Sequence, residues 1–127
     1  MISPTEYNIM KTDRFDINHL TTDIDIKIIE EANNPQYPWL EIILEKDLPY
    51  IVREEIAKQY LTAGWNFVVH QTSEENGERA GLTSFVFCTD ATYQEFFTAY
   101  RKSIENKKWY VVNRSGIYIL ENINENK

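Results

Sequence analysis

The sequence predicts an α+β fold, a mostly antiparallel sheet with helices on one face, and three observations support this class. The stretch "DLPYIVREEIAKQYLTAG" (47–64) repeats its apolar residues at helical spacing, whereas "WNFVVH" (65–70) alternates at strand spacing. Two pairs of strand-forming segments each follow a helical segment and are separated by turn residues. Helices beside antiparallel hairpins are typical of α+β proteins. With 127 residues, of which 43% are hydrophobic, the chain suits one domain (1–127) that ends in a polar tail (122–127).

The N-terminal third predicts one helix and one strand. The segment "MISPTEYN" (1–8) is expected to be loosely held unless it docks on the rest of the chain. "TTDIDIKIIEEAN" (21–33) reads as a helix capped by Thr21 or Thr22, with acids in its first turn where the helix dipole favours them. "PWLEIILEK" (38–46) reads as a strand.

The next helix spans 48–63, and its ends are well marked. Asp47 is expected to cap it, Pro49 suits the first turn, and Gly64 suits a left-handed C-terminal residue. Strands at 65–72 and 82–88 follow as a hairpin, with the turn pair Asn76-Gly77 in its charged tip. Alternation places Trp65, Phe67 and Val69 on the buried face of the first strand and His70 on the other.

A second helix, 90–106, is expected to begin at Thr89 or Asp90, and a tighter hairpin of 108–113 and 116–121 closes around Gly116. The order helix, strand, strand thus occurs twice, at 48–88 and 90–121. "GWNFVV" and "KKWYVV" match locally, because Trp65 and Trp109 each open a strand just after a helix. Duplication of one unit and two independent solutions of one packing problem both remain open.

Two His-x-Thr tripeptides, His19-Leu20-Thr21 and His70-Gln71-Thr72, match the signature of the 2H phosphoesterase-like enzymes. Residues i and i+2 of a strand point the same way, so each pair could face one phosphate, with one histidine as base and the other as acid. His70 and Thr72 meet this requirement on a predicted strand. His19 precedes a helix in which Thr21 serves better as a cap, so catalysis by these four residues is the alternative and not the main prediction.

No other catalytic, metal or cofactor motif stands out. His19, His70 and Cys88 lack the close spacing of a zinc site, although His70 and Cys88 could become neighbours across the hairpin. Cys88 lies in an apolar strand and reads as a core residue. No glycine-rich phosphate loop is followed by Lys-Ser/Thr, so no cofactor is expected. The carboxylate pairs Asp23/Asp25 and Glu30/Glu31 read as a solvated helix face.

Charge and composition narrow the partners. The formal net charge of -7 disfavours nucleic acid and favours a basic partner. A single cysteine indicates a reducing compartment, and the sequence shows neither a membrane span nor a signal peptide. We expect a soluble protein of the cytoplasm or of a particle such as a virion, and homo-oligomer formation stays open.

Aromatic residues supply the binding hypothesis. The chain has eight tyrosines and three tryptophans, and these residue types serve recognition surfaces because they bury a large area and keep a polar group. Four of them fall at loops or element ends where no helix stripe accounts for them: Tyr7, Tyr37, Trp39 and Tyr50. Closing the edges of a small core is the alternative role.

Over residues 23–88 the chain resembles a loose class of small tailed-bacteriophage proteins: a helix, a strand, a helix ending in Leu-x-x-Gly-Trp/Tyr, and an apolar strand. Leu61, Gly64 and Trp65 carry that step. The resemblance implies an accessory protein that acts by binding, in the host cytoplasm. We therefore predict a non-enzymatic protein-binding module, a phage-encoded accessory protein that engages a host or defence protein. A virion structural component and a 2H-type phosphoesterase are the alternatives.

Overall fold

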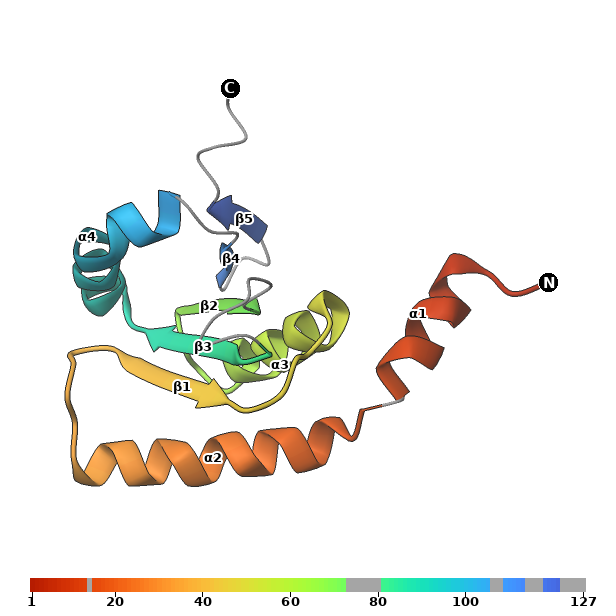
Figure 1. Cartoon of the computed structure of the whole chain (residues 1–127), viewed down its shortest axis with the longest axis horizontal. Coiled ribbons are helices and arrows are strands. Elements are labelled where there is room, and N and C mark those ends of the chain that lie inside the picture. The colour runs from red at the N-terminus through yellow and green to blue at the C-terminus, as the bar shows by residue number, and fades with distance from the viewer. Residues whose placement is uncertain (14, 73–80, 106–108, 114–117, 122–127) are drawn as a thin grey trace.

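The computed structural model describes the chain except residues 14, 73–80, 106–108, 114–117 and 122–127, and it has an α+β fold (Figure 1). The helices are α1 (Pro4–Asp13), α2 (Ile17–Asn33), α3 (Tyr50–Thr62) and α4 (Asp90–Glu105). The strands are β1 (Leu40–Leu44), β2 (Phe67–Thr72), β3 (Thr83–Cys88), β4 (Trp109–Asn113) and β5 (Tyr118–Glu121). The predicted fold class is confirmed. Among the described residues, no helix is long and apolar enough to cross a membrane.

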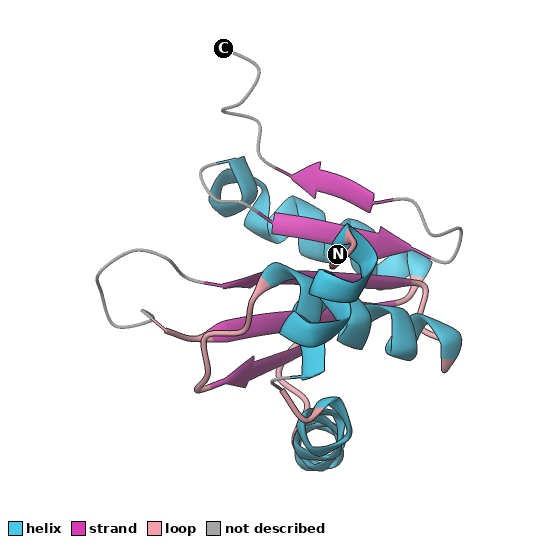
Figure 2. Cartoon of the chain, turned by 90° about the vertical axis from the view of Figure 1, so that its right-hand side faces the viewer, coloured by secondary structure: helices cyan, strands magenta, loops and turns pink. Residues whose placement is uncertain are grey.

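The five strands form one antiparallel sheet in the order β1-β3-β2-β4-β5. Both predicted hairpins are present, as β2 with β3 and β4 with β5; their tips, with Asn76-Gly77 and Gly116, lie outside the described residues. β1 is an edge strand, and in the described chain it pairs only with β3, with Ile42 opposite Phe85. Figure 2 shows α2 in end view beside this edge.

Helices cover both faces of the sheet, so the expectation of helices on one face only is wrong. On one face, α2 and α3 pack against a core that includes Ile42, Val68 and Phe85. On the other, α4 packs through Phe96 against a second core that includes Val69. Every residue of β3 is buried as a result, because its side chains alternate between two covered faces.

The helix-strand-strand order does occur twice, as α3-β2-β3 and α4-β4-β5. β2 and β4 are antiparallel neighbours, so a two-fold axis that exchanged them would be perpendicular to the sheet. Rotation about such an axis would leave α3 and α4 on the same face of the sheet. α3 and α4 lie on opposite faces instead. No two-fold axis therefore relates the two units.

The observed helix ends differ from the predicted ones in three details. α2 begins four residues earlier than expected and is capped by Asp16, whose carboxylate accepts from the His19 amide at 3.1 Å, so neither Thr21 nor Thr22 is the cap. α3 follows Pro49 without a side-chain cap, so Asp47 does not serve. Gly64 does take the expected left-handed conformation, with φ of 123°. Thr89 caps α4 by accepting from the Thr92 amide at 3.3 Å.

The N-terminal segment, expected to be loosely held unless it docked, is helical and docks on α3. α1 contacts α3, and its Tyr7, Ile9 and Met10 side chains remain more than half exposed. Contact along one side of a short helix leaves its other apolar side chains in solvent.

Candidate functional site

A buried cluster of polar groups joins α3 to β2, and we call it the arginine cluster: Arg53, His70, Thr72 and the carbonyl of Leu48. Arg53 Nε donates to His70 Nδ1 at 3.1 Å. Its Nη1 donates to Thr72 Oγ1 at 2.8 Å and to the Leu48 carbonyl at 2.6 Å. His70 and Thr72 therefore do point to the same side of β2, as predicted. They face a guanidinium in the core and not an open cleft.

His70 is held neutral in this cluster. It is 0% exposed, and burial together with the Arg53 charge lowers the pKa of its imidazole to about 3. Because Nδ1 accepts a hydrogen bond, the proton of the neutral ring lies on Nε2, which has no hydrogen-bond partner among the described residues. A buried, neutral imidazole of this kind is a poor match for a base that meets substrate from solvent.

The second His-x-Thr pair lies elsewhere. His19 is in the first turn of α2 with its side chain 64% exposed, and its Nε2 lies 3.6 Å from the Asp23 carboxylate. The Thr21 hydroxyl donates to the Asn18 carbonyl at 3.1 Å, within the helix. The structure thus places one pair on the surface of α2 and the other in the core, and it does not bring them together around one phosphate.

Cys88 and His70 are not neighbours either. In the hairpin Cys88 lies opposite Phe67 and His70 opposite Phe85, and the two side chains belong to opposite faces of the sheet. Burial raises the pKa of the Cys88 thiol to about 12, against the opposing effect of a hydrogen bond with Thr92. Within the described ranges, no group of three or more His, Cys, Asp or Glu residues could hold a metal ion.

The four aromatic residues predicted to bind a partner occupy three places. Tyr37 and Trp39 stack on each other, with ring centroids 5.1 Å apart. Tyr50 belongs with the arginine cluster, since the Arg53 guanidinium lies 5.7 Å from its ring centroid. Tyr7 is on the exposed side of α1. Only Tyr37 and Trp39 share a site.

That site is a hollow of about 260 Å³, which we call the aromatic pocket. It lies between the end of α2, the start of β1, Trp65 and the start of α4, and its lining is largely apolar. The lining includes Glu31, Ala32, Tyr37, Trp39, Trp65 and Phe87. Trp39 is fixed from behind by edge contacts with Phe96 and Tyr100, at 5.6 and 5.7 Å between centroids. Its indole N–H has no acceptor in the described part of the chain.

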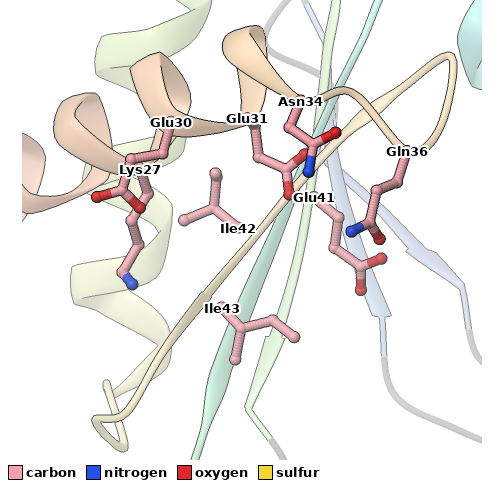
Figure 3. Close-up of a pocket in the computed structure, with 8 residues that line it drawn as sticks. All are labelled: Lys27, Glu30, Glu31, Asn34, Gln36, Glu41, Ile42 and Ile43. Carbon is pink, nitrogen blue, oxygen red and sulfur yellow. The ribbon is translucent and has the colours of Figure 1, made fainter.

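A second hollowed region runs between α2 and the edge strand β1, and we call it the acidic groove. It consists of two hollows of about 300 and 370 Å³ that share Lys27 and Glu30. Figure 3 shows the first, with Glu31 of α2 and Asn34 just after the helix above β1, and Glu41, Ile42 and Ile43 along the strand. Five carboxylates and two ammonium groups line the groove: Asp23, Glu30, Glu31, Glu41, Glu45, Lys27 and Lys46.

The groove has a net of three negative charges over an apolar floor. Ile42 and Leu44 are buried at its base, and Ile26 is 50% exposed at its side. Glu31 also lines the aromatic pocket, so the acidic groove and the aromatic pocket adjoin at this residue. An edge strand, an acidic helix face and an aromatic pocket thus lie next to one another.

The groove was not predicted from the sequence, where Glu30 and Glu31 read only as a solvated helix face. Its residues come from two elements that meet in the folded chain. The available signal was the order of an acidic helix and then a strand preceded by prolines, "EEANNPQYPWLEIIL".

Comparison with known proteins identifies no relative of this chain. The chain matches no protein-family model, and neither a curated protein nor a solved structure is similar to it at a significant level.

Proposed function

We propose that the chain is a non-enzymatic protein-binding module that takes an extended, basic segment of a partner protein into the acidic groove. One observation carries the proposal: an edge strand lies beside a groove that combines an apolar floor with a net negative charge. Edge strands offer main-chain donors and acceptors, and a segment that adds to such an edge gains hydrogen bonds whatever its sequence.

Main-chain and apolar contacts supply most of the affinity in this proposal. Exposed ion pairs are worth only about 0 to 1 kcal/mol each, so the carboxylates contribute mainly to selectivity and to the rate of association. Alternating side chains of the added strand point to opposite faces, so basic residues on one face would meet Glu30 of α2 and basic residues on the other face would meet Glu41. Ile43, which is half-buried and shares the face of Glu41, would contact apolar side chains of the segment.

A second copy of the chain fits the groove less well. The whole chain carries a formal charge of -7, so two copies repel each other where the groove is acidic. A virion component would use the β1 edge for pairing between copies and remains the alternative within binding. The charge favours a different, basic partner.

The sequence resemblance gives the finer form of the proposal: a phage-encoded accessory protein that engages a host or defence protein in the host cytoplasm. The placement of His70 in the core and His19 on α2 supports binding over the 2H-type phosphoesterase alternative. That enzyme would need both imidazoles at one phosphate.

The test is a selection of random 12-residue peptides displayed in a library, with the full chain as bait. We expect enriched peptides to be rich in Lys and Arg and to bind more weakly as salt is raised. Glu30→Lys, on the shared wall of both hollows, should weaken the best peptide several-fold, because it removes one attraction and adds one repulsion. Glu95→Lys is the matched control, since it makes the same charge change at an exposed position of α4.

Strand addition has its own readout. Methylation of backbone nitrogens at alternate positions of the peptide should abolish binding in one register and leave it unchanged in the other, because only every second amide faces β1. Binding that is equal for Glu30→Lys and Glu95→Lys, or tolerant of methylation in both registers, would contradict the proposal. An absence of enriched peptides would contradict it too.

A further inference from the structure

We infer that the aromatic pocket is a specificity site for one aromatic side chain, presented by the partner segment that occupies the acidic groove. The inference rests on the proposed function for the origin of the side chain. The pocket itself is a separate hollow, with its own lining, and can be tested alone.

The size of the pocket limits its occupant. Sites for drug-sized ligands have volumes of roughly 300–1,000 Å³, and this pocket, at about 260 Å³, falls below that range. One large side chain fits such a volume, whereas a nucleotide or a cofactor does not. The lining agrees, because Tyr37 and the partly buried Trp65 expose ring surface, whereas Trp39 is 8% exposed and Phe87 is buried. Glu31 is the one carboxylate among the described lining residues.

The rings are held in place before any ligand binds. Trp39 is 8% exposed, stacked on Tyr37 at 6° between planes and braced by two rings of α4. Trp65 packs on Phe87 with centroids 5.5 Å apart. The loop that carries Tyr37 has a proline on either side, Pro35 and Pro38, which restricts its backbone. Preorganised aromatic residues cost little entropy on binding and commonly dominate the affinity of an interface.

The position of the pocket explains why the groove and the pocket should act together. Glu31 lines both, and Gln36 of the groove is next to Tyr37 of the pocket. A segment that follows β1 toward Leu40 therefore reaches the mouth of the pocket. Tyr37 is 47% exposed there, and a ring entering the pocket would cover it.

An aromatic ligand favours ring stacking in this place. Offset-stacked and edge-to-face ring pairs add free energy beyond the area that they bury, and an aliphatic side chain lacks this contribution. The pocket should therefore rank Phe and Trp above Leu at the anchor position of a peptide.

A probe that needs no partner tests the pocket directly. N-acetyl-phenylalaninamide titrated into the full chain should shift the NMR signals of the Ala32 methyl group and of the Trp39 and Trp65 indoles, and the shifts should saturate. Ala32→Phe fills the pocket from an exposed position of α2 and should abolish the shifts of the two indoles; Ala32→Leu, a smaller change, should weaken them. Ala99→Phe, exposed on α4 away from the lining, is the control and should behave as wild type.

Shifts that do not saturate, or that survive in Ala32→Phe, would overturn the inference. The groove is tested separately by Glu30→Lys, so the two failures are distinguishable: loss of the pocket with intact peptide binding refutes this inference alone. When the aromatic anchor of a selected peptide is replaced by Ala, the affinity of the peptide for the wild-type protein should fall at least tenfold. The affinity of the peptide for Ala32→Phe should not change with the same replacement.

Discussion

The arginine cluster should make the protein less stable as the pH falls from 7 to 5, through His70 alone. An unfolded histidine has a pKa near 6.5, and the folded His70 has a pKa of about 3. Between these values the unfolded chain binds a proton that the folded chain does not. The stability that neutral His70 confers is thus fully present above pH 6.5 and is lost as the pH falls toward 3.

The size of the effect follows from the same two values. Each pH unit within the window lowers the free energy of unfolding by about 1.4 kcal/mol, and integration from pH 7 to pH 5 gives a loss of about 2 kcal/mol. This interval lies above the ordinary pKa range of carboxyl groups, so the contribution of aspartate and glutamate is small there.

The assay is urea unfolding followed by tryptophan fluorescence at pH 7, 6 and 5, for the wild type and His70→Gln. The glutamine amide oxygen can still accept from Arg53 Nε, and it does not titrate. We expect His70→Gln to be less stable at pH 7 by about 1–3 kcal/mol, since the core packing changes, and to lose about 2 kcal/mol less than the wild type by pH 5.

His19→Gln controls for removal of an exposed imidazole and should keep the wild-type pH dependence, because His70 is intact. Equal losses in the wild type and in His70→Gln would refute the reasoning. They would mean that the buried imidazole either does not titrate on unfolding or is protonated in the folded core.

Three further predictions concern single positions. Gly64→Ala should lower the free energy of unfolding by about 1–3 kcal/mol, because residues with a side chain rarely adopt a φ of 123°. The cost comes from the backbone and not from a clash, since a Cβ at this position would have nothing within 4 Å. An unchanged urea midpoint would contradict the left-handed conformation at the end of α3. Cys88 should react with Ellman's reagent at pH 8 only as fast as the chain opens, since burial raises the pKa of its thiol to about 12; rapid labelling of the folded protein would show an accessible thiolate. Tyr60→Phe should cost about 1–2 kcal/mol by removing a 2.6 Å hydrogen bond to the Asp25 carboxylate, whereas Tyr37→Phe, at an exposed ring, should leave stability unchanged in the same assay.

The secondary structure was largely predictable because it depends on local spacing. The apolar stripe of α3 is legible, and Gly64 marks its end. The alternation of β2 predicted a strand but not its burial, because Val68, Val69 and His70 are all 0% exposed and both faces of the strand are covered. The distribution of helices over the sheet was not. β3 reads "TSFVFC", a run that fits a strand covered on one face or on both, and only the packing of α4 decides between them.

The interior of the site was not predicted. Arg53 lies at helical spacing from the buried Ile56, Ala57 and Tyr60, but an arginine on an apolar stripe carries no signal that it is buried. Its partner His70 could not be identified, because that pairing depends on how α3 lies across β2. The acidic groove is further from prediction, since α2 and β1 must first pack together before their carboxylates share a wall.

The location of α2 beside β1 also bears on aggregation. An uncovered sheet edge can pair with the edge of any other chain, and proteins commonly protect such edges with charge or with a neighbouring element. Here both protections meet at one strand, since α2 flanks β1 and carboxylates line the approach. The same groove that would admit a basic segment would therefore repel other copies of this acidic chain, which disfavours pairing between their β1 edges.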